Sequence, residues 1–214
     1  NVAKAYIVQD EQLEQEGQLE VVDGEVRRIK SIDVIPNPLA LNMYMLGYTS
    51  DGKLTRLNEA VKQNVKIYLS QYRVLTDAIN LKDAYIINVG VRFAITVKRG
   101  FNKNEVLFKA IQQVKKFFET KKWQINQPIV LSDIAYVIGL VDGVVTVVPP
   151  QDNNPNKNLV VIENKHKVAE GYSGNIYDTD AATRDGIVYT SLDPSIFEVK
   201  YPNVDIEGRV VGDR

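Results

Sequence analysis

A few side chains carry groups that can act in catalysis or hold a metal ion. His166 is the single histidine among 214 residues, and an imidazole can serve as a general base because it titrates near neutral pH. Ser132 with Asp133 could contribute to a nucleophilic site, and the carboxylates of residues 178–185 could bind calcium. Cysteine is absent, which excludes disulfides, thiol catalysis and cysteine-ligated metal sites.

The spacing around these residues favours structural roles. His166 has no partner histidine or cysteine in the chain and fits an exposed loop or strand edge. No Gly-x-Ser-x-Gly elbow surrounds a serine, so Ser132 and Asp133 fit the first turn of a helix. The run Asp178-Thr179-Asp180 with Asp185-Gly186 lacks the ligand spacing of an EF-hand loop. The sequence therefore predicts that the protein is not an enzyme, with no catalytic residue, no metal site and no cofactor.

Charge is unevenly distributed along a chain whose net charge is −1. Residues 1–52 carry a net −5, residues 53–122 a net +10 and residues 123–214 a net −6. The basic region mixes lysines with aromatic residues over 115–123, as proteins that bind single-stranded nucleic acid do. On a helix, however, Phe117 and Phe118 continue an apolar stripe and belong to the core. Trp123, just beyond that helix, fits either the core or a contact surface.

Hydrophobic periodicity predicts the elements that must position these residues. Residues 1–46 read as short strands, with 39–46 either a strand or a buried helix, and residues 53–73 read as an amphipathic helix. Apolar residues then alternate over 86–98, which predicts a strand with one buried face. A helix capped by Asn102, a second helix capped by Ser132 and an apolar strand over 144–148 follow. The fold class is therefore α+β, with a strand-helix-helix-strand layer.

The sequence suggests three regions: 1–77, with strands and a helix; 78–150, a compact α+β domain; and 151–214, a loop-rich β arm. Residues 151–158 are rich in asparagine and proline and read as a linker. The arm has short apolar groups that suit addition to a sheet edge or contact with a partner. Its large aromatics Tyr189 and Phe197, together with Trp123, are the candidate partner contacts.

Four motifs follow one another along the chain: Arg73-Val74-Leu75-Thr76-Asp77 after a helix, the alternating strand that ends at Lys98-Arg99-Gly100, the helix at Leu131-Ser132-Asp133-Ile134, and the turn Val141-Asp142-Gly143-Val144. Their order resembles the baseplate J-like family of contractile-tail bacteriophages. Residues 172–178 and 191–198 resemble the C-terminal region of the T-even-type wedge members of that family. The resemblance implies a virion component of the tail baseplate, present in the host cytoplasm during assembly. It also implies association with itself, as a homodimer or ring, and with other baseplate wedge proteins, and it transfers no catalytic residue.

Two other functions remain open at this level. A nucleic-acid-binding module could use the basic region 53–122. A cell-wall hydrolase would need paired carboxylates in a cleft, which the four acidic residues of the arm could supply: Glu163, Glu170, Asp178 and Asp180. No apolar run reaches the roughly 20 residues of a membrane helix. The chain begins with Asn1 and is interpreted as an internal or C-terminal piece of a longer protein.

Overall fold

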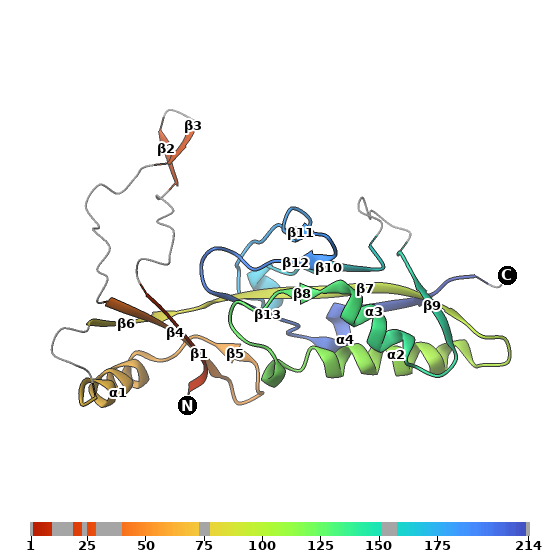
Figure 1. Cartoon of the computed structure of the whole chain (residues 1–214), viewed down its shortest axis with the longest axis horizontal. Helices are drawn as coiled ribbons and strands as arrows, with labels where there is room; N and C mark the ends of the chain where they lie inside the picture. The colour runs from red at the N-terminus through yellow and green to blue at the C-terminus, as the bar shows by residue number, and fades with distance from the viewer. Residues whose placement is uncertain are drawn as a thin grey trace. The chain divides into compact units, whose positions relative to one another are not determined.

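The computed structural model describes residues 2–9, 19–22, 25–28, 40–72, 78–150 and 158–212. It divides into two compact units (Figure 1). Unit 1 comprises residues 1–47 and 56–84, and unit 2 comprises residues 48–55 and 85–214. Both helices and mixed sheets are present, so the predicted α+β class is confirmed.

Unit 1 is built around strand β4 (Ala40–Tyr48). β4 pairs antiparallel with β1 (Val2–Gln9) and parallel with β6 (Ala78–Asp83). β2 (Leu19–Val22) and β3 (Glu25–Arg28) form an antiparallel pair of their own. Of the two alternatives for residues 39–46, the strand is correct. Met45 and Leu46 are almost fully buried in β4, so the apolar run reflects a strand covered on both faces.

Helix α1 (Glu59–Ser70) is shorter than the sequence predicted. Asn58 caps its start by accepting a hydrogen bond from the Ala60 N–H at 2.6 Å. Leu54 and Thr55 form strand β5 instead of helix. Leu54 and Leu57 of the predicted amphipathic helix are buried, but they precede α1, and no residue of α1 itself is buried. Tyr68 and Tyr72 pack ring against ring at 5.1 Å while each stays more than half exposed.

Unit 2 is organised by the long strand β7 (Tyr85–Val97). β10 (Val160–Asn164) and β9 (Val144–Val148) follow one another along one edge of β7, both antiparallel to it. β13 (Ser195–Glu198) and β14 (Ile206–Val210) follow one another along the opposite edge, both parallel to it. Short helix α4 (Pro202–Asp205) joins these two strands. Figure 1 shows β7 running the length of this unit.

The units divide the chain after Ala84, whereas the sequence analysis placed a boundary after residue 77, and no division falls at the other predicted boundary, residue 150. Three of the four strands paired with β7 come from the region expected to be a separate arm. Val160 and Ile196 are fully buried, and Phe197 is 1% exposed. The short apolar groups of the tail do form strands, and they add to sheet edges of the same unit: residues 160–164 and 195–198 pair with β7, and residues 187–188 pair with residues 129–130. The predicted linker 151–158 lies outside the described residues except for Asn158.

Two helices cover the sheet of unit 2. α2 (Lys103–Phe117) begins at the predicted cap, where Asn102 Oδ1 accepts from the Asn104 and Glu105 N–H groups. α3 (Leu131–Gly139) starts two residues earlier than predicted, with Val130 at the cap position, so Ser132 is an exposed first-turn residue and not the cap. The helices bury one face each, through Val106, Ala110 and Val114 of α2 and Leu131, Ile134 and Ile138 of α3. Within the described ranges, no helix combines the length and apolar character needed to cross a membrane.

A close approach between α2 and the sheet depends on Gly208 of β14. A Cβ at this position would lie 2.6 Å from Phe93 Cζ and 2.8 Å from Leu107 Cδ1. Phe93 is 1% exposed, so its ring has little freedom to move away. The glycine therefore leaves the space that the Phe93 ring and the Leu107 side chain occupy.

A small sheet joins β8 (Ile129–Val130), which immediately precedes α3, to a hairpin from the tail. β11 (Thr183–Arg184) and β12 (Ile187–Val188) form this hairpin, and β12 pairs antiparallel with β8. Asp185 and Gly186 make the two-residue turn with φ values of 52° and 76°. Asp-Gly is the typical sequence of such a turn, so this dipeptide closes a hairpin.

Candidate functional site

Trp123 lies in an aromatic cluster at the end of α2. Its indole stacks on Phe118 with the rings 5.3 Å apart and 3° from parallel. Its ring meets Phe117 edge-on at 5.8 Å, and its Nε1–H donates to the Phe117 carbonyl oxygen at 3.1 Å. With 4% of its surface exposed, the indole belongs to the core and presents only a small area at the surface.

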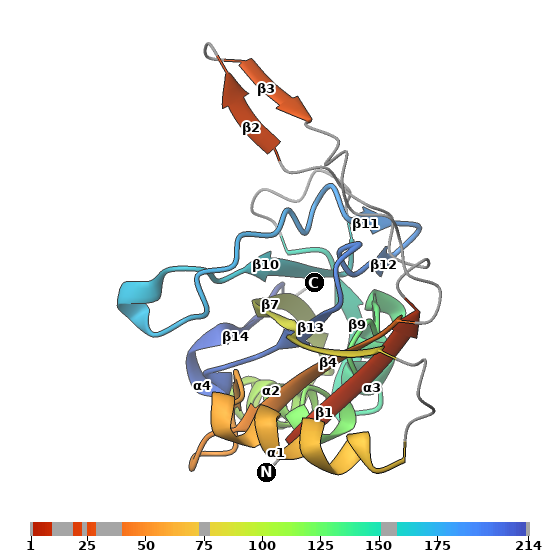
Figure 2. The ribbon, with the colours of Figure 1, turned by 90° about the vertical axis from the view of Figure 1, so that its left-hand side faces the viewer.

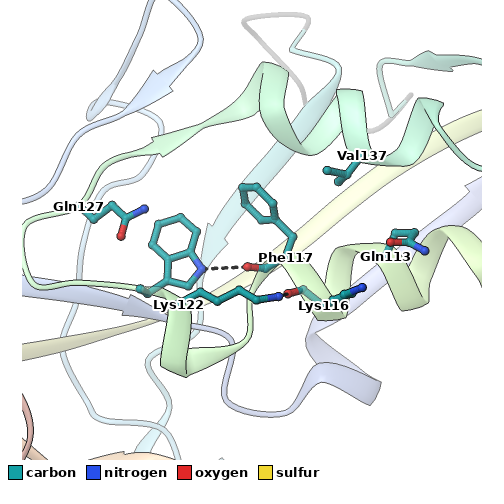
Figure 3. Close-up of a pocket in the computed structure, with 7 residues that line it drawn as sticks. Gln113, Lys116, Phe117, Lys122, Gln127 and Val137 are labelled. Atoms are coloured by element: carbon teal, nitrogen blue, oxygen red, sulfur yellow. Dashed lines mark hydrogen bonds between the residues drawn. The ribbon is translucent and has the colours of Figure 1, made fainter.

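A groove lies directly over this cluster and has a volume of about 350 Å³. We call it the Trp123 groove. It is lined by Gln113, Lys116 and Phe117 of α2, Lys122 of the 3₁₀ helix η2 (Thr120–Lys122), Trp123, Gln127, and Val137 of α3. Figure 3 shows the Phe117 ring directed toward Val137, with the two glutamines at opposite ends. The groove thus has an apolar centre and a polar rim.

The rim of the groove is basic. Lys116 and Lys122 are both exposed, and Lys122 Nζ donates to the Lys116 carbonyl oxygen at 2.7 Å. Lys122 also forms an ion pair with Glu119 at 3.0 Å. Gln127 Oε1 accepts from the Gln124 N–H at 2.9 Å, which fixes its amide at one end of the groove. An elongated group with an apolar body and negative charge matches this lining.

The other two candidate contacts are in different environments. Tyr189 is 47% exposed, and its carbonyl oxygen accepts from the Tyr177 hydroxyl at 2.7 Å, so its position agrees with a surface role. The expectation that Phe197 forms a surface contact is wrong. It lies in β13, paired with β7, and is 1% exposed. An aromatic residue in a short polar-flanked strand is typical of both settings, and only the pairing of β13 with β7 distinguishes them.

Sequence reasoning did not identify the buried polar network around Asn88 of β7. Asn88 Nδ2 donates to Glu198 Oε2 at 2.9 Å, and Asn88 Oδ1 accepts from the Ser173 N–H at 2.7 Å. Glu198 Oε1 accepts from the Leu54 N–H at 2.7 Å. Burial raises the pKa of the Glu198 carboxyl above its ordinary value. Because both side chains are fully bonded to distant segments, the network positions the chain and leaves little capacity for a ligand.

The same network holds a loop, residues 165–177, against β7. Ser173 Oγ and Asn175 Nδ2 both donate to the Ile86 carbonyl oxygen, at 2.7 and 2.8 Å. The Tyr172 hydroxyl donates to Asp205 Oδ1 at 2.5 Å, and burial with this bond raises the pKa of Tyr172. Tyr172, Ser173 and Asn175 belong to the 172–178 motif singled out in the sequence analysis. In Figure 2 the segment after β10 projects beyond the end of that strand and then turns back.

Of the residues singled out for chemistry, some form ion pairs and the others are exposed. Glu163 forms ion pairs with Arg92 and with Lys165, and Glu170 forms one with Lys167. The remaining members of the set are exposed: His166, Ser132, Asp133, Asp178 and Asp180. In the part of the chain that the structure describes, no group of three or more His, Asp or Glu side chains could hold a metal ion.

Comparison with known proteins adds no assignment, since no family model matches the chain and no curated protein is significantly similar to it.

Proposed function

We propose that the chain is a structural subunit of a contractile-tail baseplate, a wedge component that associates with itself and with other wedge proteins. The order of the sequence motifs supports this proposal, and the 165–177 loop is the observation that carries it. Val168 and Ile176 of this loop are 70% and 79% exposed. On this proposal the protein acts through its surfaces and carries out no reaction, in the virion and in the host cytoplasm during assembly.

The attachment of the loop is what makes these exposed side chains a binding surface. Ser173 and Asn175 bind the β7 backbone, so the loop is ordered before any partner arrives. A Cβ on Gly174 would come within 2.9 Å of Val168 Cγ2, which places the Val168 side chain against the loop backbone. Two apolar side chains on a preformed support lose little conformational entropy when they are buried by a partner.

Sedimentation velocity with the whole chain tests self-association. We expect a dimer or larger species whose population rises with concentration. Ile176→Asp should weaken assembly with the chain itself or with wedge proteins, because a charge buried in an apolar contact is unfavourable. Val204→Asp is the matched control, since Val204 of α4 is 66% exposed and lies outside the loop. A chain that stays monomeric, and that no baseplate wedge protein binds, would overturn the proposal.

A second candidate, a nucleic-acid-binding module, is favoured by one observation. Lys116 and Lys122 are exposed beside an aromatic groove. Two facts weigh against it: Trp123 is buried rather than presented for base stacking, and the basic region 53–122 is divided between the two units. Binding of a single-stranded oligonucleotide, with affinity falling steeply between about 50 and 200 mM salt, would favour this candidate.

A further inference from the structure

We infer that the Trp123 groove binds an acidic peptide segment with a leucine anchor, namely residues 10–18 of a second copy of this chain. The inference rests on the proposed self-association and names one contact that would produce it. It concerns a surface separate from the 165–177 loop, so the two can be tested independently.

The groove offers a preformed apolar floor. Phe117 and Val137 line its centre. The Trp123 ring is fixed by its stacking on Phe118 and by the hydrogen bond from its Nε1–H to the Phe117 carbonyl oxygen. A volume of about 350 Å³ is at the lower end of the range in which pockets bind small groups. One branched aliphatic side chain, with the backbone that carries it, suits this space better than an extended apolar surface does.

The rim sets the charge of the occupant. Lys116 and Lys122 line the groove, and Lys115 and Lys121 directly precede them in sequence. The amides of Gln113 and Gln127 stand at the two ends and can bond a peptide backbone, as polar groups at the ends of an otherwise apolar site commonly do.

Residues 10–18 match this lining. The segment contains Asp10, Glu11, Glu14 and Glu16, no lysine or arginine, and one large apolar residue, Leu13. Its charge of −4 is opposite in sign to Lys116 and Lys122, the two lysines that line the groove. Charge matching of this kind selects a partner and speeds its binding, while the apolar anchor supplies the contact area.

Such a contact joins two different surfaces. The segment of one copy enters the groove of the next copy, so the contact is heterologous and not symmetric about a two-fold axis. Heterologous contacts build closed rings when the rotation between copies closes, and open chains when it does not.

The first test uses the single tryptophan of the chain as the reporter. A synthetic peptide of residues 10–18 is titrated into the whole chain while Trp123 emission is followed. We expect saturable binding that weakens as salt rises. Two reference peptides, one with the four acids replaced by amides and one with Leu13→Ser, should each bind about tenfold more weakly, a loss of about 1.4 kcal/mol.

The second test uses variants of the whole chain. Lys116→Glu with Lys122→Glu should lower peptide affinity at least about tenfold and shift sedimentation toward the monomer. Lys98→Glu with Lys103→Glu is the matched control, because it makes the same charge change outside the groove lining. Glu11→Lys with Glu14→Lys should restore association when combined with the groove variant.

The outcomes separate this inference from the proposed function. If the chain self-associates but the peptide leaves Trp123 emission unchanged and the groove variant associates normally, the inference alone is wrong. If the chain stays monomeric even though the peptide binds, both the second copy as occupant and the proposed self-association are wrong. Tighter binding of a single-stranded oligonucleotide than of the peptide, lost in the groove variant, would overturn the inference in favour of nucleic acid.

Discussion

Asn88 and Glu198 stand opposite one another in the parallel pair of β7 and β13, and Asn88 Nδ2 donates to Glu198 Oε2 at 2.9 Å. Both side chains are almost fully buried. Through its other carboxylate oxygen Glu198 also accepts from the Leu54 N–H, so one pair of side chains links three separate stretches of unit 2.

Replacing Asn88 with alanine should destabilise unit 2 by about 2–4 kcal/mol, since it leaves a buried Glu198 oxygen and the Ser173 N–H without their bonds. Asn104→Ala is the control, because Asn104 is exposed on α2 and should change stability by less than about 0.5 kcal/mol. Chemical denaturation measures both. Equal losses would mean that the network contributes nothing specific.

The pH dependence of stability should carry the signature of Glu198. Because burial raises the folded-state pKa of this carboxyl, the folded state holds the proton more tightly than the unfolded state does. The free energy of unfolding therefore falls as pH rises from the unfolded value through the folded pKa. Glu198→Gln should remove that slope, whereas Asp180→Asn, at an exposed position, should keep it. Denaturation curves across this range of pH provide the measurement, and an unchanged slope in Glu198→Gln would contradict the assignment.

Gly208→Ala should destabilise the protein by about 1–3 kcal/mol, because the added methyl group would overlap the Phe93 ring and the Leu107 side chain. Gly139→Ala is the matched substitution. Gly139 lies in α3 with no atom within 4 Å of the added Cβ, so this change should stabilise by a few tenths to about 1 kcal/mol. Thermal or chemical melts of the two variants should shift in opposite directions; a shift in the same direction would mean that the sheet relaxes freely at Gly208.

Phe93→Ala should cost about 3–5 kcal/mol, as expected for a large side chain in a close-packed core. Phe108→Ala removes the same ring from a position that is 61% exposed on α2 and should be nearly neutral. Equilibrium unfolding distinguishes them. Similar losses at both positions would place Phe108 in a buried contact.

A fragment ending at residue 150 should fail to fold unit 2. It lacks β10, β13 and β14, which pair with β7 along both of its edges. Circular dichroism and hydrogen exchange of the β7 amides test this expectation. A cooperative melt with protected β7 amides would show that the tail strands are dispensable.

Local pattern predicted the elements of unit 2 well and their partners poorly. The alternation of apolar residues over 86–98 and the cap at Asn102 gave β7 and α2 almost to the residue. The strand over 144–148 matched β9. These features depend on neighbours in sequence, where periodicity and capping act directly.

The errors concern contacts between distant residues. β14 contains Glu207, Gly208 and Arg209, a composition that does not indicate a strand. It is a strand because it pairs with an edge of β7. Its glycine, Gly208, leaves room for the Phe93 ring. Phe197 looked like a surface anchor because its partners lie about 110 residues earlier in the chain. The run 115–123, singled out in the sequence, supplies four of the groove residues, but the other three, Gln113, Gln127 and Val137, were missed because α2, η2 and α3 meet there only after folding.

The parallel pairing of β13 and β14 with β7 also sets the order in which the chain can be completed. β13 begins at residue 195 and β14 ends at residue 210, so the edge of β7 that they cover has no partner until these residues have been synthesised. Long-range parallel pairing is slow, and an uncovered strand edge invites pairing with another chain. An incomplete chain would therefore leave this edge of β7 open to pairing with another copy.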